Sequence, residues 1–136
     1  MENLNTESTE HTEGKRDPLT GKVIGAAIEV HRHLGPGLLE STYQHCLAHE
    51  LALRGINFTL ETPLPVYYKG TNLDCGYRAD VLVENCLVIE LKAIEKIASI
   101  HEAQLLTYMK HAEAPVGLII NFNCKLLKDG IKRFVL

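Results

Sequence analysis

The sequence predicts one α/β domain built around a mixed β-sheet. Segments with helical periodicity alternate with short strand-like runs, in the predicted order α-α-β-β-β-α-β. Residues 116–122 (VGLIINF) are almost continuously apolar, which is typical of a buried strand beside a parallel neighbour. The chain has 136 residues, which is enough for one ordinary domain and too few for two.

Two helices are predicted before the sheet. Asp17 and Pro18 suit the N-cap and the first position of a helix. Its apolar face comprises Leu19, Val23, Ala27, Val30 and Leu34, and residues 35–37 (GPG) end it. A second helix is expected over about residues 38–54, with Gly55 after it. Its apolar stripe consists of Tyr43, Leu47 and Leu51.

Three strands should follow the helices. Residues 56–61 and 66–69 are separated by two prolines, so we expect them to form one broken edge strand. Residues 74–83 alternate between apolar and polar side chains, and residues 87–91 form a short apolar run. These two segments predict a pair of neighbouring strands.

The remaining elements complete the predicted sheet. A third helix is expected over about residues 100–111, and Pro115 follows its end. The apolar run at 116–122 then supplies a central strand. Residues 126–136 suit a turn and one last strand.

The composition is typical of a globular protein and argues against a membrane-spanning or secreted one. Hydrophobic residues make up 46% of the chain and charged residues 23%, which is ordinary for a globular protein. No apolar run approaches the ~20 residues of a membrane span, and the polar N-terminus lacks the apolar core of a secretory signal. The four cysteines form no C-x-x-C pair, which argues against structural zinc. We therefore expect a cytoplasmic protein without a membrane partner.

The net charge of −3 is concentrated at the N-terminus. Residues 1–17 carry five acidic and two basic residues, so the rest of the chain is neutral overall. We expect residues 1–16 to form a disordered acidic tail and residues 17–136 to form the one folded domain. A neutral domain attracts nucleic acid weakly as a whole. Contact with phosphates would use a local patch, such as the basic end with Lys132 and Arg133.

Three charged residues fall on the two neighbouring strands. Glu90 and Lys92 are two residues apart, so their side chains point to one face of the sheet. If the turn comprises residues 84–86, Asp80 lies directly opposite Glu90. A two-residue turn would need a bulge to restore this arrangement.

Two carboxylates at such a distance repel each other unless a cation lies between them. Carboxylate and carbonyl oxygens suit Mg²⁺ or Mn²⁺. A neighbouring lysine can hold or polarise the water that attacks phosphorus. The alternative is a surface hairpin with a Glu–Lys ion pair, and the spacing alone does not decide between the two.

Polar residues on the predicted helices favour the metal site. Glu40 precedes Tyr43 by three residues and so shares the inward stripe of the second helix, where a carboxylate needs a partner. The alternative is a first-turn glutamate stabilised by the helix dipole. Gln104 and Tyr108 are four residues apart on one face of the third helix. Buried, they too would need partners; otherwise that helix is amphipathic and partly exposed.

These residues together resemble the bacterial GxxExxY protein family, which is assigned to the PD-(D/E)xK nuclease superfamily. Gly37-x-x-Glu40-x-x-Tyr43 matches the motif that names the family, and Asp80 followed by Glu90-x-Lys92 resembles its metal signature. Gln104-x-x-x-Tyr108 is similar to the helix motif of the RecB-like exonuclease branch. Asn121-Phe122 and the basic end at residues 131–133 resemble the C-terminal pattern. One departure is Ala79, which stands where the signature has a proline.

The resemblance implies a restriction-endonuclease-like αβββαβ core with an extra N-terminal helix. It also implies that Asp80 and Glu90 bind Mg²⁺ or Mn²⁺, with the Leu91 carbonyl as a third ligand. Lys92 would position the attacking water, and Glu40 would join the metal site directly or through water. The residues expected to support the site or to contact nucleic acid are Gln104, Tyr108, Tyr43, Lys132 and Arg133.

We therefore expect a metal-dependent nuclease-like domain that hydrolyses nucleic-acid phosphodiester bonds, with DNA as its partner. Two alternatives stay open. One is a non-catalytic module that keeps the nuclease fold for binding or regulation. The other is a small dimeric junction resolvase, which would act as a homodimer. The intact Asp–Glu–Lys set favours an enzyme, whereas the neutral charge and small size favour weak or partner-dependent activity.

Overall fold

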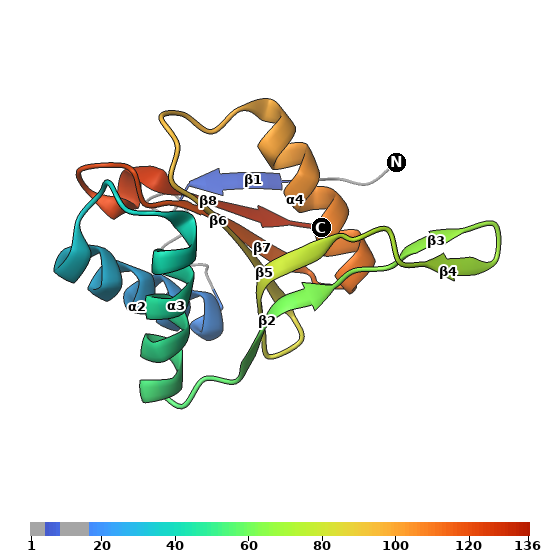
Figure 1. The fold of residues 1–136 in the computed structure, drawn as a ribbon, viewed down its shortest axis with the longest axis horizontal. Helices are drawn as coiled ribbons and strands as arrows, with labels where there is room; N and C mark the ends of the chain where they lie inside the picture. Colours follow the sequence, from blue (N-terminus) through green and yellow to red (C-terminus); the bar gives the residue numbers. More distant parts are fainter. Residues whose placement is uncertain (1–4, 9–16) are drawn as a thin grey trace.

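A six-stranded mixed sheet forms the centre of the structure (Figure 1). The computed structural model describes residues 5–8 and 17–136. β6 and β7 are parallel and every other neighbouring pair is antiparallel, so the predicted parallel pair at the centre of the sheet is confirmed. The strands lie in the order β1 (Asn5–Ser8), β8 (Ile131–Val135), β7 (Val116–Asn121), β6 (Leu87–Lys92), β5 (Arg78–Val83) and β2 (Phe58–Pro63).

Helices cover both faces of the sheet. α2 (Pro18–Leu34) and α3 (Glu40–Leu53) pack in one apolar cluster with the sheet, and α4 (Ser99–Ala112) packs in a second cluster on the other face. The short 3₁₀ helix η1 (Leu127–Gly130) leads into β8. The α/β class and the mixed sheet agree with the prediction. None of the described helices combines the length and apolar character needed to cross a bilayer.

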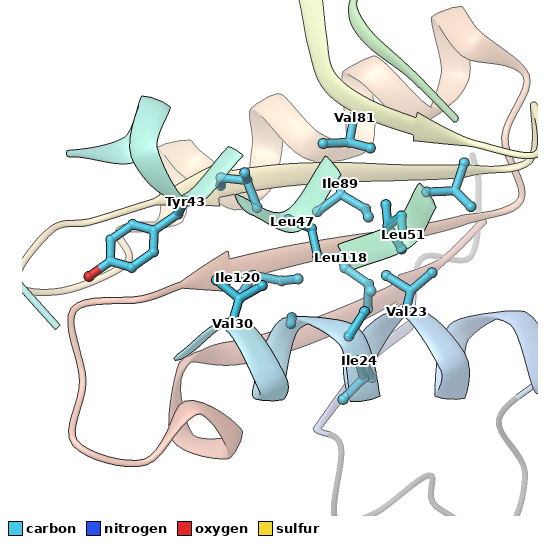
Figure 2. Packing of buried hydrophobic residues seen from close by; sticks show 14 of the residues in the cluster. Val23, Ile24, Val30, Tyr43, Leu47, Leu51, Val81, Ile89, Leu118 and Ile120 are labelled. Carbon is cyan, nitrogen blue, oxygen red and sulfur yellow. The ribbon is translucent and has the colours of Figure 1, made fainter. Parts of the chain in front are cut away.

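The two N-terminal helices begin and end close to where the sequence predicts. The Asp17 side chain caps α2 by accepting a hydrogen bond of 2.8 Å from the Thr20 amide, and Gly35 ends the helix at a φ of 70°. Tyr43, Leu47 and Leu51 of α3 are fully buried. Figure 2 shows this stripe facing sheet residues such as Val81, Ile89 and Leu118, with α2 beneath.

The opposite face depends on a close approach between α4 and β7. A Cβ atom on Gly117 would lie 2.5 Å from the Met109 sulfur and 3.1 Å from a methyl group of Leu105. Both of these side chains are fully buried. A larger residue at position 117 would therefore push α4 away from the sheet.

The segment between α3 and β5 differs from the prediction. The expected broken strand is wrong: β2 joins the main sheet, while β3 (Val66–Tyr68) pairs with β4 (Thr71–Leu73) in a separate two-stranded hairpin. Lys69 and Gly70 both have positive φ, which suits the two-residue turn of a hairpin. β5 begins at Arg78 instead of residue 74, because Asp74 accepts a hydrogen bond from the Gly76 amide and forms a turn there.

The first residues also differ in part. We expected disorder over residues 1–16, yet residues 5–8 form β1, antiparallel to β8. Without β1, one side of β8 would be an unpaired sheet edge, and main-chain pairing with that edge does not require apolar side chains. Residues 1–4 and 9–16 lie outside the described residues.

Candidate functional site

The turn between β5 and β6 sets the register that the site needs. Val83 pairs with Leu87, so the turn comprises residues 84–86, as the first of the two predicted registers requires. Glu84 and Asn85 both have positive φ and make this tight turn. The ladder continues to the pair of Val81 with Ile89. The next position brings Asp80 opposite Glu90.

At that position the backbone amides donate to side-chain carboxylates instead of to carbonyl groups of the opposite strand. The Asp80 amide donates to Glu90 Oε1 at 3.3 Å, and the Leu91 amide donates to Asp80 Oδ2 at 2.8 Å. Each carboxylate therefore reaches across to the backbone of the other strand. The two acidic groups are held beside each other, as predicted for this pair.

Burial and mutual repulsion disfavour two charges at this point. Glu90 is only 8% exposed, and burial followed by repulsion from Asp80 raises its pKa to about 8. Burial also raises the pKa of Asp80, with contributions from Glu61 and Glu40, although the Leu91 amide opposes the shift. The pair would titrate as one coupled system, and a cation between the carboxylates would favour their charged forms.

Lys92 lies at the end of β6, two residues beyond Glu90. Its side chain is half-buried, and its positive charge lowers the pKa of both Asp80 and Glu90. Within the described part of the chain, its ammonium forms no hydrogen bond or ion pair. This cation is thus close enough to act on the acidic pair and is not committed to another partner there.

Glu40 reaches the site but is not buried as expected. It is the first residue of α3 and is exposed, because the helix begins at residue 40 and not near residue 38. Its Oε2 accepts a hydrogen bond of 3.2 Å from the amide of Ala93, directly after Lys92. A pocket of about 270 Å³ is lined by Glu40, Ser41, Gln44, Glu61, Asp80 and Leu91.

Three residues of this pocket, Ser41, Gln44 and Glu61, were not predicted from the sequence, and two of them make hydrogen bonds there. Gln44 Nε2 donates to Glu61 Oε2 at 2.7 Å and to the Asp80 carbonyl at 2.9 Å. Gln44 follows Glu40 by four residues, so helical spacing could have pointed to it. Glu61 has a φ of 49° inside β2, and no pattern in the sequence predicts that distortion.

Tyr43 supports the turn that leads into α3. Its hydroxyl donates to the Gly35 carbonyl at 2.6 Å and accepts from the Leu38 amide at 3.2 Å. Its ring stacks on Phe122 at a centroid distance of 4.3 Å. Because Tyr43 is fully buried, its contacts hold the chain before Glu40 in place and leave no surface for a substrate.

The two predicted residues of α4 lie in different environments. Tyr108 is half-buried and contacts the ring of Tyr77 at a centroid distance of 5.9 Å. Burial, followed by the Glu90 carboxylate, raises the pKa of Tyr108. Gln104 is exposed and forms no hydrogen bond among the described residues. The structure thus brings Tyr108 under the influence of the acidic pair, but not Gln104.

The basic residues of β8 are not gathered on one path to the site. Lys132 forms an ion pair with Glu102 of α4 at 2.5 Å, whereas Arg133 is buried and contacts Asp17 at 3.3 Å. Consecutive strand residues point to opposite faces: Glu102 lies on α4, whereas Asp17 caps α2 on the other face of the sheet. The structure therefore separates this predicted pair.

A divalent cation would find a small donor set here. No group of three or more His, Cys, Asp or Glu side chains is arranged to hold a metal ion in the part of the chain that the structure describes. Main-chain geometry adds one oxygen: the Leu91 amide points to Asp80, and the N–H and C=O of a strand residue face the same side. Two carboxylates and one carbonyl thus face the gap between β5 and β6.

Comparison with known proteins agrees with this arrangement. Searches of curated proteins and of solved structures give no significant match. The sequence profile described as the PD-(D/E)XK nuclease superfamily matches residues 17–134, from the N-cap of α2 into β8. The match does not distinguish the GxxExxY family or the RecB-like branch, which stay predictions. The chain belongs to the PD-(D/E)XK nuclease superfamily.

Proposed function

We propose that this protein is a metal-dependent nuclease that hydrolyses phosphodiester bonds of DNA. The observation that carries the proposal is the opened β5–β6 ladder, which places the carboxylates of Asp80 and Glu90 together with Lys92 nearby. A charged cluster at a position where backbone pairing is lost has no evident benefit for stability. It has an evident use in binding a cation and a phosphate.

The donor set suits Mg²⁺ or Mn²⁺. Mg²⁺ keeps several waters and is usually bound through one or two carboxylates together with substrate phosphates. Asp80, Glu90 and the Leu91 carbonyl would hold the ion, and Glu40 would reach it directly or through water. When bound, such an ion stabilises the charge that develops on phosphorus oxygens during hydrolysis.

The remaining roles follow from the surroundings of each side chain. Lys92 would hold the attacking water, since its ammonium is not committed to another described group. Gln44 would position Asp80 through its bond to the Asp80 carbonyl. Tyr43 would support Glu40, and Tyr108 and the exposed Gln104 would contact the substrate backbone. Lys132 and Arg133 would stabilise β8 through their ion pairs.

One observation favours the alternative of a non-catalytic binding module. Each carboxylate of the pair already accepts a backbone amide, so the site can be stable without a metal. Such a module would bind nucleic acid without cleaving it. A dimeric junction resolvase would show a preference for branched DNA and a dimer in light scattering.

A cleavage assay separates these proposals. We expect the full chain to cut linear, nicked or branched DNA with Mg²⁺ or Mn²⁺ and not with EDTA. Lys92→Ala should lower the rate by about 10²–10³-fold, as loss of one preorganised electrostatic contact does. Lys22→Ala removes an exposed positive charge on α2, which contributes no residue to the candidate site, and should leave the rate unchanged. Binding without any cleavage in either metal would favour the module instead.

A further inference from the structure

The β3–β4 hairpin extends beyond the main sheet as an arm (Figure 1). Its strands have three residues each, a length of about 10 Å. Tyr67 and Tyr68 are 67% and 60% exposed. Since consecutive strand residues point to opposite faces, both faces of the arm present an aromatic ring to solvent. A two-stranded hairpin has little stability of its own, and these rings add nothing to the core.

The aromatic residues continue from the arm toward the acidic pair. Tyr77 lies at the base of the arm, where its carbonyl accepts a hydrogen bond of 2.9 Å from the Leu64 amide. Its ring is 46% exposed and contacts Tyr108, which packs against the apolar cluster that contains Ala79, the residue before Asp80. Of the five tyrosines of the chain, two therefore lie on the arm, one lies at its base and a fourth contacts that one.

The chemistry of this surface suits unpaired bases. Tyrosine rings stack on any base, because every base has a π-face, and a neighbouring cation can contact the phosphates. Lys69 supplies such a cation at the turn of the arm, with its Nζ 5.5 Å from the centre of the Tyr68 ring. In a duplex the bases stack on each other and their faces are covered. The exposed rings therefore favour a single strand over a duplex.

We propose that the β3–β4 arm and Tyr77 bind single-stranded nucleic acid and lead it to the Asp80–Glu90 pair. This inference rests on the nuclease function proposed above, because it assigns the substrate class of that site. The arm would act by stacking, and the neutral charge of the domain does not oppose this. A second copy of the chain is the rival occupant of the same rings.

Binding without metal tests the arm separately from catalysis. Fluorescence anisotropy in EDTA would compare the full-length chain with its Tyr67→Ala and Tyr68→Ala variants, using labelled oligo(dT), oligo(U) and duplex DNA. Each alanine should weaken single-strand binding by about 5- to 150-fold, the range for loss of one stacked base. Tyr67→Phe and Tyr68→Phe keep the ring and should bind like wild type. Leu53→Ala removes another exposed apolar side chain, at the end of α3, and serves as a control.

Tyrosine fluorescence supplies a second readout. The chain has no tryptophan, so its emission comes from tyrosine, and stacked bases should quench it in proportion to binding. Circular dichroism would confirm that each variant is folded, and Tyr67→Leu offers a milder change if an alanine variant is not.

Several results would overturn the proposal. These are wild-type binding by the alanine variants, equal loss in the phenylalanine variants, duplex binding as tight as single-strand binding, or a change from dimer to monomer that accounts for the loss. If the arm variants cleave DNA as fast as wild type, the nuclease function stands and the role proposed for the arm is wrong. If binding depends on the arm but no cleavage occurs, the role of the arm stands and the nuclease function is wrong.

Discussion

The two ends of the β5–β6 hairpin differ in their side chains and in how their backbone amides are hydrogen-bonded. Near the turn, Val81 pairs with Ile89 and Val83 with Leu87, and all four side chains are buried in the core. One position further, carboxylates accept the amides, and the Asp80 carbonyl bonds to Gln44 of α3. Within a few residues the same hairpin changes from a regular apolar ladder to a polar site.

The apolar end stabilises the fold, whereas the polar end carries the acidic groups that the fold holds in place. The apolar end gains free energy from burial and from satisfied backbone pairs. The polar end places two acidic groups where burial and repulsion both disfavour their charges. The apolar end should therefore respond to loss of volume, whereas the polar end should respond to pH and to cations.

The largest effect is expected at the apolar end. Ile89→Ala should lower the free energy of unfolding by about 4 kcal/mol, because it removes a fully buried side chain and leaves a cavity between the sheet and the α2–α3 layer. Urea denaturation would measure the change. Leu39→Ala, at a residue that is 73% exposed, should change the stability little. A loss below about 1 kcal/mol for Ile89→Ala would mean that burial at the apolar end does not stabilise the fold as inferred.

The next effect is expected at the polar end and depends on pH. The pKa of Glu90 rises from 4.5 to about 8 on folding. Between these values the folded state binds more protons than the unfolded state, so the free energy of unfolding falls as the pH rises. We expect a loss on the order of 3 kcal/mol between pH 5 and pH 8 from this coupled pair.

Glu90→Gln should remove most of that pH dependence. Its amide oxygen can still accept the Asp80 amide, while the buried charge is gone. Denaturation at several pH values would compare it with Glu95→Gln, a change of an exposed glutamate in the following loop. The seven histidines of the chain are common to all three proteins, so the comparison isolates the change at residue 90. A Glu90→Gln variant with the wild-type pH profile would place the titrating group elsewhere.

The apolar end and the acidic pair of the polar end were predictable from the sequence, whereas the contacts that surround the pair were not. Alternation in β5 places Asp80 opposite Glu90 if the turn has three residues, and the observed pairing of Val83 with Leu87 shows that it does. These are local patterns. The contacts of Gln44 and the distortion at Glu61 join α3, β2 and β5 across the fold, and no local pattern contains them.

The predictions that were wrong also depended on features that the local sequence pattern did not fix. Glu40 is exposed because α3 begins at that residue, and a shift of two residues moves a side chain from the inward stripe to the helix end. The β3–β4 hairpin was missed because Lys69–Gly70 was not recognised as a turn. Lys132 and Arg133 looked like one basic patch in the sequence, but strand alternation sends them to opposite faces.

The smallest expected effect comes from adding a cation, and it tests the polar end most directly. Mg²⁺ or Mn²⁺ at about 100 times its dissociation constant should stabilise the folded protein by roughly 2.7 kcal/mol, because the unfolded chain has no assembled site. Asp80→Asn should lose most of this response. Its side-chain oxygen can still accept the Leu91 amide, and the variant no longer repels Glu90, so at pH 8 without metal it should be at least as stable as wild type.

Thermal melts with EDTA and with each metal measure both properties. Asp129→Asn, in the exposed part of η1, removes one negative charge outside the site and should keep the metal response. If Asp80 were only structural, its loss would weaken a charge-assisted hydrogen bond without relieving any repulsion, and the variant would be less stable. A destabilised Asp80→Asn that responds to metal like wild type would contradict a metal site between β5 and β6, and the opened ladder would then need another explanation.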